Sequence, residues 1–284
     1  MLKAVLAAGT LGFLVWHLGT GPFLDGLRAV DAGALAAAAG LAVLTTVCCA
    51  WRWKVVARGL GDDLPLRTAV ASYYRSLFLN VTLPGGVVGD VHRGISHGLR
   101  AVVWERTAGQ VVQLVLTVVV LLVLPSPLGT TVPIVALALV AGGAVLVWRS
   151  ELLAGRAWPA VALASALVVA GHAVTFLIAA RTAGVTAPPS QMLPLALLVL
   201  MGAALPNVGG WGPREGVTAW AFAAAGLGAS VGVATAVVYG VMVFVASLPG
   251  AAVLVAAWVC HTRSAPWLPG RLGVLARHDG AQDA

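Results

Sequence analysis

Long apolar stretches alternate with short polar ones along most of the chain, and their lengths predict membrane-spanning helices. A helix needs about 20 apolar residues to cross a bilayer, within a range of about 17 to 25. Stretches of suitable length lie at residues 2–18, 32–50, 107–124, 132–148, 156–181 and 230–259. The pattern therefore predicts about six transmembrane helices, the last of them bent near Pro249.

Two further apolar regions are too short to cross a membrane in one piece. The first consists of residues 68–80 and 88–98, and the second of residues 191–205 and 215–227. Each region is predicted to form a helix, a break rich in Pro and Gly, and a second helix, which is typical of a re-entrant hairpin. Such a break is tolerated at membrane depth only where it is buried in protein or lines a wet cavity.

The order of these elements divides the chain into two similar halves, residues 1–128 and 129–262. Each half contains two helices, a hairpin and a third helix. Three crossings is an odd number, so the second half must lie upside down relative to the first. Inverted repeats with broken helices are typical of transporters. We expect one polytopic membrane domain over residues 1–262 and a disordered cytoplasmic tail over residues 263–284.

Composition supports this fold class. Hydrophobic residues make up 60% of the 284 residues, charged residues only 10%, and the mean hydropathy is +0.96. A soluble domain carries about 25% charged residues, so the chain is predicted to be an all-α integral membrane protein. It leaves no room for a sizeable soluble domain.

The formal net charge of +7 is explained by membrane topology rather than by nucleic-acid binding. Lys and Arg collect in the cytoplasmic loops of membrane proteins. Most of the 17 basic residues fall in cytoplasmic segments when the N-terminus is placed in the cytoplasm. The sequence therefore predicts a multi-pass protein of the plasma membrane with both termini cytoplasmic.

The two predicted breaks share a sequence pattern. "LPGGVVGDVHRG" (residues 83–94) and "LPNVGGWGPREG" (residues 205–216) each contain Leu-Pro, a glycine cluster, an acid with an arginine, and a closing glycine. Proline removes a backbone donor and glycine permits tight backbone paths. The residues expected to form the breaks are Pro84, Gly85, Gly86, Gly89, Pro206, Gly209, Gly210, Gly212 and Gly216.

Four charged residues beside the breaks are the candidate headgroup site: Asp90, Arg93, Arg214 and Glu215. Free N–H groups at a helix start favour an anion, and an arginine can hold a phosphate with two hydrogen bonds. Asn80 could satisfy backbone groups freed by the first break. The structural alternative is that the acids only cap helices and pair with the arginines. Ionisable residues at membrane depth nevertheless indicate function.

Other candidate chemistry is weaker. Asp90, His92 and His97 do not form a metal site, because only residues 90 and 97 share a helical face. We expect no metal and no cofactor. None of the motifs of serine hydrolases, nucleotide-binding loops or dinucleotide-binding folds occurs in the sequence.

Several single charges receive structural interpretations. Arg52 and Lys54 follow the second apolar stretch and are expected to stop it at the membrane surface. Glu105 and Arg106 are expected to form a salt bridge at the cytoplasmic end of the third stretch. His172 is expected to form a hydrogen bond between helices.

The two breaks also carry a family resemblance. "FLNVTLPGGVVGDVHRG" resembles the N-x-x-LPGG-x-GGD-x-x-R block, and "LPNVGGWGPREG" the P-x-x-GG-x-G-x-RE-G block, of the lysylphosphatidylglycerol synthase/flippase transmembrane family. Val88 replaces the first glycine of GGD, so the turn before Asp90 departs from the family pattern. We expect the protein to lack the soluble aminoacyltransferase domain of the bifunctional members. The resemblance therefore implies movement of a lipid between leaflets rather than synthesis of an aminoacyl lipid.

We accordingly expect a flippase-like transporter of an anionic phospholipid or a polyprenyl-phosphate-linked lipid. Membrane lipids are the expected partners, together with a homo-oligomer or a cell-envelope enzyme, and nucleic acid is not. One alternative is a membrane-embedded enzyme that acts on a lipid phosphate, with Asp90 and His92 as its acid–base pair. Another is a non-catalytic membrane partner of a cell-envelope enzyme.

Overall fold

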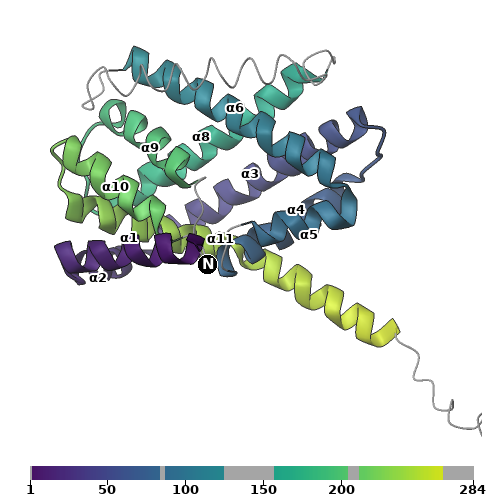
Figure 1. The fold of residues 1–284 in the computed structure, drawn as a ribbon, viewed down its shortest axis with the longest axis horizontal. Coiled ribbons are helices and arrows are strands. Elements are labelled where there is room, and N and C mark those ends of the chain that lie inside the picture. Colours follow the sequence, from purple (N-terminus) through teal and green to yellow (C-terminus); the bar gives the residue numbers. More distant parts are fainter. Residues whose placement is uncertain (1, 84–86, 125–156, 204–210, 265–284) are drawn as a thin grey trace, which may run out of the picture.

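The computed structural model describes residues 2–83, 87–124, 157–203 and 211–264 (Figure 1). All the elements that these residues form are α-helices. They are α1 (Leu2–Leu18), α2 (Gly21–Ala29), α3 (Ala32–Gly59), α4 (Leu66–Thr82), α5 (Val88–His97), α6 (Leu99–Val123), α8 (Trp158–Thr182), α9 (Pro189–Ala203), α10 (Pro213–Ala224) and α11 (Ala229–Ser264).

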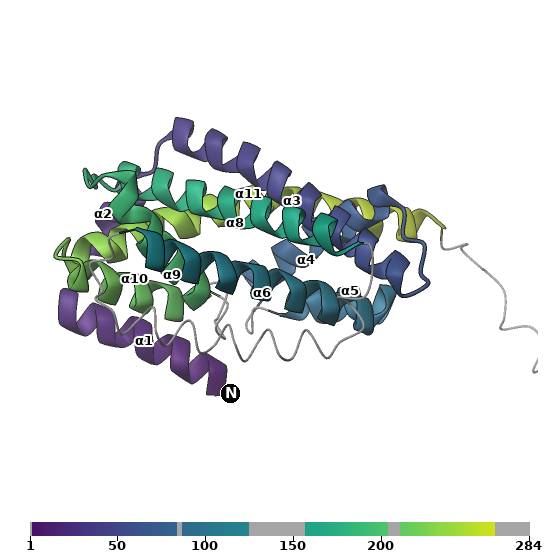
Figure 2. The ribbon, with the colours of Figure 1, turned by 90° about the horizontal axis from the view of Figure 1, so that it is seen from above.

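Four of the described helices are long and apolar enough to cross a membrane: α3, α6, α8 and α11. Figure 2 shows these four running lengthwise through the molecule. An α-helical membrane protein is therefore confirmed. Helix α1 is apolar but shorter, and the predicted stretch at 132–148 lies outside the described residues, as does most of the tail. Six crossings remain a prediction.

Two of the long helices extend well beyond the apolar stretches that predicted them. Helix α3 continues through Arg52 and Lys54 to Gly59, and α6 begins at Leu99, before Glu105 and Arg106. The expectation that Arg52 stops a helix at the membrane surface is wrong, because α3 continues past it and its side chain is buried in the protein interior. A buried charge is tolerated in a helix when an opposite charge meets it. Arg52 and Glu105 provide each other with such a partner.

Helix α2 was not predicted from the hydrophobic pattern. It is only nine residues long, carries a proline in its first turn and has a basic residue, Arg28, in its last turn. Its packing depends on Gly26, where a Cβ atom would lie 2.7 Å from the carbonyl oxygen of Ala234 in α11. Close backbone contact, rather than a long apolar face, holds this helix in place.

Helix α11 runs without interruption through Pro249 and packs along α4. Gly250, the next residue of α11 after Pro249, approaches the α4 backbone closely. A Cβ atom at Gly250 would lie 2.1 Å from the carbonyl oxygen of Tyr74. Helices α3 and α8 meet in a similar way, with a Cβ at Gly171 falling 2.4 Å from Cγ2 of Thr45. Small residues allow membrane helices to approach in this way.

The contacts among the helices recur in two parallel sets. In the first part of the chain α3 packs on α4, α4 on α5, and α5 on α6; in the second part α8 packs on α9, α9 on α10, and α10 on α11. Between the parts, α6 contacts α8 and α9, while α11 contacts α3 and α4, and α3 packs directly on α8. The sets correspond when α3, α4, α5 and α6 are matched with α8, α9, α10 and α11. Each of these contacts then has a counterpart in the fold, and the α3–α8 contact is its own counterpart.

The close approach at Gly250 leads to a stability prediction. We expect Gly250→Ala to lower the free energy of unfolding by about 1–3 kcal/mol, because the new methyl group must push one helix backbone away from another. Apparent melting temperature in detergent measures this effect. Gly40→Ala in α3 is the matched control, since a Cβ atom at Gly40 meets nothing within 4 Å. A melting temperature equally unaffected by both substitutions would show that the contact does not constrain the fold.

Candidate functional site

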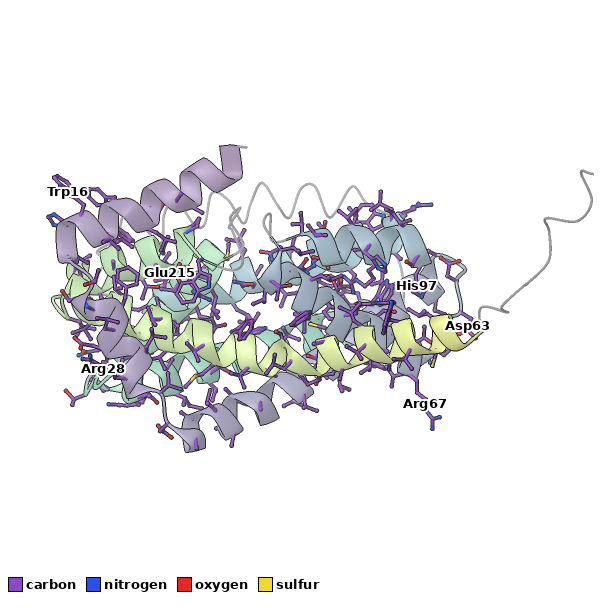
Figure 3. All side chains as sticks on the ribbon, turned by 90° about the horizontal axis from the view of Figure 1, so that it is seen from below. Trp16, Arg28, Asp63, Arg67, His97 and Glu215 are labelled. Carbon is purple, nitrogen blue, oxygen red and sulfur yellow. The ribbon has the colours of Figure 1, made fainter. Side chains whose placement is uncertain are left out.

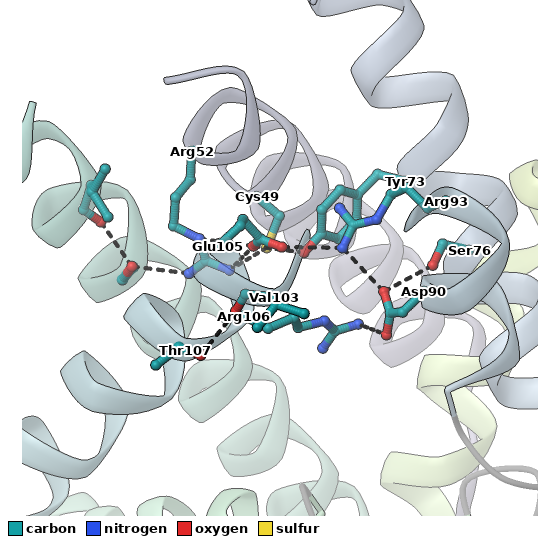
Figure 4. A network of polar contacts seen from close by, with 12 residues as sticks. Cys49, Arg52, Tyr73, Ser76, Asp90, Arg93, Val103, Glu105, Arg106 and Thr107 are labelled. Atoms are coloured by element: carbon teal, nitrogen blue, oxygen red, sulfur yellow. Dashed lines mark hydrogen bonds and ion pairs between the residues drawn. The ribbon is translucent and has the colours of Figure 1, made fainter. Parts of the chain in front are cut away.

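Five charged side chains from three helices meet in the interior of the first half and form what we call the first ion cluster (Figure 4). Arg52 comes from α3, Asp90 and Arg93 from α5, and Glu105 and Arg106 from α6. Helix α4 adds uncharged polar groups around them. Three guanidinium groups and two carboxylates leave the cluster with one excess positive charge when all five are ionised.

Glu105 lies at the centre of the cluster and is fully buried. Its Oε1 accepts hydrogen bonds from Nε of Arg52 at 2.9 Å and from the hydroxyl of Tyr73 at 3.0 Å, and Arg52 also donates from Nη2. Its Oε2 accepts from Nη2 of Arg93 at 3.1 Å. The third nitrogen of Arg52, Nη1, donates to Ser165 in α8 at 2.9 Å. The carboxylate therefore ties α3, α4, α5 and α6 together.

Asp90 is the second carboxylate and accepts bonds from four side chains. Ser76 donates at 3.1 Å, Asn80 at 3.0 Å and Arg93 at 3.1 Å, and Nη2 of Arg106 donates as well. Asp90 lies in α5, outside the four candidate spans. Burial alone would raise the pKa of this carboxyl, but the Arg106 and Arg93 guanidinium groups and Asn80 hold the pKa below its ordinary value.

Arg93 is enclosed by aromatic rings as well as by carboxylates. Its guanidinium carbon lies 4.5 Å from the ring centroid of Trp53 and 4.1 Å from that of Tyr73, and the residue is only 1% exposed. Such stacking on ring faces stabilises a cation in a dry environment. The buried Nε and Nη1 groups of Arg93 have no hydrogen-bond partner. The geometry thus leaves donor capacity on a cation that the protein holds rigidly.

The hairpin formed by α4 and α5 is closed by Asn80 and Gly89. The Asn80 side-chain oxygen accepts the Gly89 backbone N–H at 2.8 Å, as predicted for a residue that satisfies freed backbone groups. A Cβ atom at Gly89 would lie 2.1 Å from the carbonyl oxygen of Ser76, so α5 packs directly on the α4 backbone. Pro84, Gly85 and Gly86 lie outside the described residues.

In the second half, Arg214 and Glu215 form a separate buried pair. Nε of Arg214 donates to Oε1 of Glu215 at 3.0 Å, and Nη2 donates to the same oxygen. The other oxygen accepts the Gly212 N–H at 2.6 Å, so Glu215 also caps α10. The guanidinium lies 5.6 Å from the Trp211 ring centroid and 5.4 Å from that of Tyr239. This pair is neutral, unlike the first ion cluster.

Two glycines of the second break hold α1 against α10. Gly212 has a φ of +114°, a conformation that favours glycine, and a Cβ atom there would lie 2.7 Å from Cα of Ala7. A Cβ atom at Gly216 would lie 2.8 Å from Cγ2 of Thr10. These glycines therefore serve helix packing. The remaining predicted break residues, Pro206, Gly209 and Gly210, lie outside the described residues.

The first ion cluster and the Arg214–Glu215 pair do not contact each other. Glu215 and His97, which packs against Trp53 of the first site, lie toward different ends of α11 in Figure 3. A cavity of about 70 Å³ lies between α3, α4, α8 and α11, with Tyr73 and His172 in its wall. His172 lies 3.3 Å from the hydroxyl of Tyr239, which confirms its expected role between helices.

Sequence reasoning missed three members of the first ion cluster: Arg52, Glu105 and Arg106. The expected salt bridge between Glu105 and Arg106 is wrong, since Glu105 pairs with Arg52 and Arg93 while Arg106 pairs with Asp90. One feature of the sequence pointed to an interior position for Glu105 and Arg106, namely that they directly precede the apolar stretch 107–124.

Asp90 and His92, the acid–base pair expected for a membrane-embedded enzyme that acts on a lipid phosphate, do not face each other. His92 is exposed on α5, while Asp90 faces the cluster and is occupied by four donors. The polar contacts of the described residues do not join the two side chains. The alternative therefore has no geometric support.

Comparison with known families gives one result. A family model described as the lysylphosphatidylglycerol synthase TM region matches residues 1–158, which is more than half of the chain and includes every member of the first ion cluster. Comparisons with curated proteins and with solved structures gave no match.

The central position of Glu105 predicts a large effect of its neutralisation. We expect Glu105→Gln to lower the free energy of unfolding by about 3–5 kcal/mol, because it leaves buried guanidinium groups without a counter-ion. Thermal unfolding of the purified protein measures the loss. Asp63→Asn is the matched control, since Asp63 pairs with Arg58 at 3.8 Å on the exposed surface. Equal stability of the two variants would contradict a structural role for the cluster.

Proposed function

The chain belongs to the lysylphosphatidylglycerol synthase transmembrane-region family, and we propose from this premise that it moves an anionic lipid between the leaflets of the plasma membrane. The lipid is a phospholipid or a polyprenyl-phosphate-linked lipid. Its phosphate binds at the first ion cluster, and its hydrocarbon chains remain in the bilayer. The family places the protein in lipid metabolism or transport, and the movement between leaflets is our proposal.

The excess positive charge of the first ion cluster carries this proposal. Each guanidinium contacts a carboxylate, but two carboxylates cannot fully compensate three guanidinium groups, so the largely buried cluster favours an added anion. Arg93 offers two unpartnered N–H groups, Nε and Nη1. These two groups lie on different edges of the guanidinium, so each can donate a single hydrogen bond to a phosphate oxygen, and a planar pair forms only where Nη2 joins one of them. A phosphate group therefore complements both the charge and the remaining hydrogen-bonding capacity of the cluster.

The arrangement of helices supports a transport mechanism. We propose that the α4–α5 and α9–α10 pairs are re-entrant hairpins that enter the membrane from opposite sides. The parallel sets of helix contacts are what two like halves require, and broken helices meeting between such halves are the usual substrate sites of transporters. In this scheme Arg214 makes a second contact with the phosphate as the lipid moves between the leaflets. Glu215 positions the Arg214 side chain, as their pairing suggests.

The proposed inverted topology predicts which loops are exposed on each side. In a background without Cys48, Cys49 and Cys260, we expect Asp62→Cys to react with a membrane-impermeant thiol reagent only from the cytoplasmic side. We expect Thr186→Cys to react only from the outside. Both positions are exposed in the structure. Labelling of both positions from the same side would exclude the inverted arrangement.

The transport proposal predicts that Arg93 is required. In liposomes containing the purified protein, we expect Arg93→Ala to slow the exchange of fluorescent phosphatidylglycerol between leaflets by about tenfold or more, since a charge-assisted hydrogen bond contributes ~1.5–3 kcal/mol. Arg93→Lys should restore only part of the rate, because lysine lacks the planar pair of donors. Quenching of the outer leaflet by a reductant reports the exchange.

Arg67→Ala is the control for this assay, because Arg67 is exposed on α4. Arg214→Ala tests the second proposed contact in the same way. Folded Arg93→Ala protein that exchanges lipid as fast as the parent would remove the proposal.

A further inference from the structure

Both carboxylates of the first ion cluster are shared by two arginines, but Asp90 is the partly exposed one, at 13% against 0% for Glu105. Asp90 accepts hydrogen bonds from Arg93 in α5 and from Arg106 in α6, and it is also held by Ser76 and Asn80 in α4. The Asp90–Arg106 bond is an ion pair between α5 and α6. Whatever displaces Asp90 from Arg106 therefore changes the connection between these two helices.

The exposure of the three side chains falls in order from the surface inward. The Arg106 side chain is 42% exposed, that of Asp90 is 13% exposed and that of Arg93 is completely buried. An anion that arrives from outside the cluster therefore meets Arg106 first. It reaches Arg93 only after Asp90 has moved aside. Arg106 also retains an unpartnered buried Nε group.

We propose that Asp90 is an internal substitute for the lipid phosphate, and that the phosphate displaces it from Arg106 and Arg93. This inference rests on the proposed function and adds Arg106 as the first binding residue. After the exchange, Ser76 and Asn80 keep the Asp90 carboxylate on the side of α4. Asp90 thus remains solvated by two donors while the phosphate takes over the two guanidinium groups.

Charge balance then defines the substrate class. Glu105 and Asp90 together neutralise two of the three guanidinium groups of Arg52, Arg93 and Arg106. A headgroup with one net negative charge, such as a phosphodiester with an uncharged alcohol, brings the cluster to neutrality. A zwitterionic headgroup leaves the excess positive charge uncompensated, and a headgroup with two negative charges adds an unpaired negative charge. Burial favours the neutral combination.

Binding to the full-length protein in detergent tests the inference without requiring transport. The probes are dihexanoyl phosphatidylglycerol with one negative charge, dihexanoyl phosphatidylcholine with no net charge, and glycerophosphoglycerol, a phosphodiester with one negative charge and no acyl chains. We expect the parent protein to bind the first probe at least about tenfold more tightly than the other two. Equal binding of glycerophosphoglycerol would assign the site to free phosphodiesters and overturn the lipid assignment.

The variants are expected to act in opposite directions. Asp90→Asn removes the internal competitor and should tighten the binding of dihexanoyl phosphatidylglycerol by about tenfold, whereas Arg106→Gln should weaken it by about tenfold. Arg100→Gln is the matched control, because Arg100 is an exposed arginine on the same helix. Folded Asp90→Asn protein with parental or weaker affinity would overturn the competition.

Ser76→Ala supplies a second test in case Asp90→Asn does not fold. Ser76 is buried, donates to Asp90 in the structure and does not belong to the proposed phosphate contacts. After the proposed exchange this hydrogen bond contributes more, because the two arginines no longer neutralise the carboxylate. Its loss should therefore weaken binding by a few-fold, and unchanged affinity would contradict the exchange. If these affinities behave as expected while lipid exchange is absent, transport fails and the binding site stands. If Arg93 is required for exchange but Asp90→Asn does not tighten binding, only the present inference fails.

Discussion

The structure depends on the neutralisation of Glu105 inside an apolar bundle. This carboxylate is fully buried and is reached by Arg52, Tyr73 and Arg93 from three other helices. A buried carboxylate is costly unless its oxygens are paired and hydrogen-bonded. The bundle can therefore close only in the arrangement that brings these donors together. Specific polar contacts, as well as packing, fix how α3, α4, α5 and α6 are placed, and they leave a positively charged site beside α5.

The helical fold could be predicted from sequence because the hydrophobic pattern is local. Runs of about 20 apolar residues have few alternatives to a membrane helix, and four such helices are present among the described residues. The predicted breaks correctly separated α4 from α5 and α9 from α10. Asn80 was likewise correctly identified as a partner of freed backbone groups, through Gly89.

The composition of the first ion cluster could not be predicted in the same way. Arg52 and Glu105 are 53 residues apart, and Arg52 and Ser165 are 113 residues apart. Charge patterns at helix ends suggested surface positions for Arg52 and Glu105, because sequence gives the sign of a charge but not its distant partner. The helices continue through these residues once the partners meet. The paired breaks look alike in sequence, yet the structure places a net positive cluster beside one and a neutral pair beside the other.

The crossing of α3 and α8 has a mechanical consequence. Helices α3 and α8 occupy matching positions in the two sets of helix contacts, so each set contributes one helix to this crossing. A methyl group of Thr45 fits against the bare backbone at Gly171 there. A larger side chain at Gly171 has no free space at this contact, so it would push α3 and α8 apart and loosen the packing between the two sets of helices.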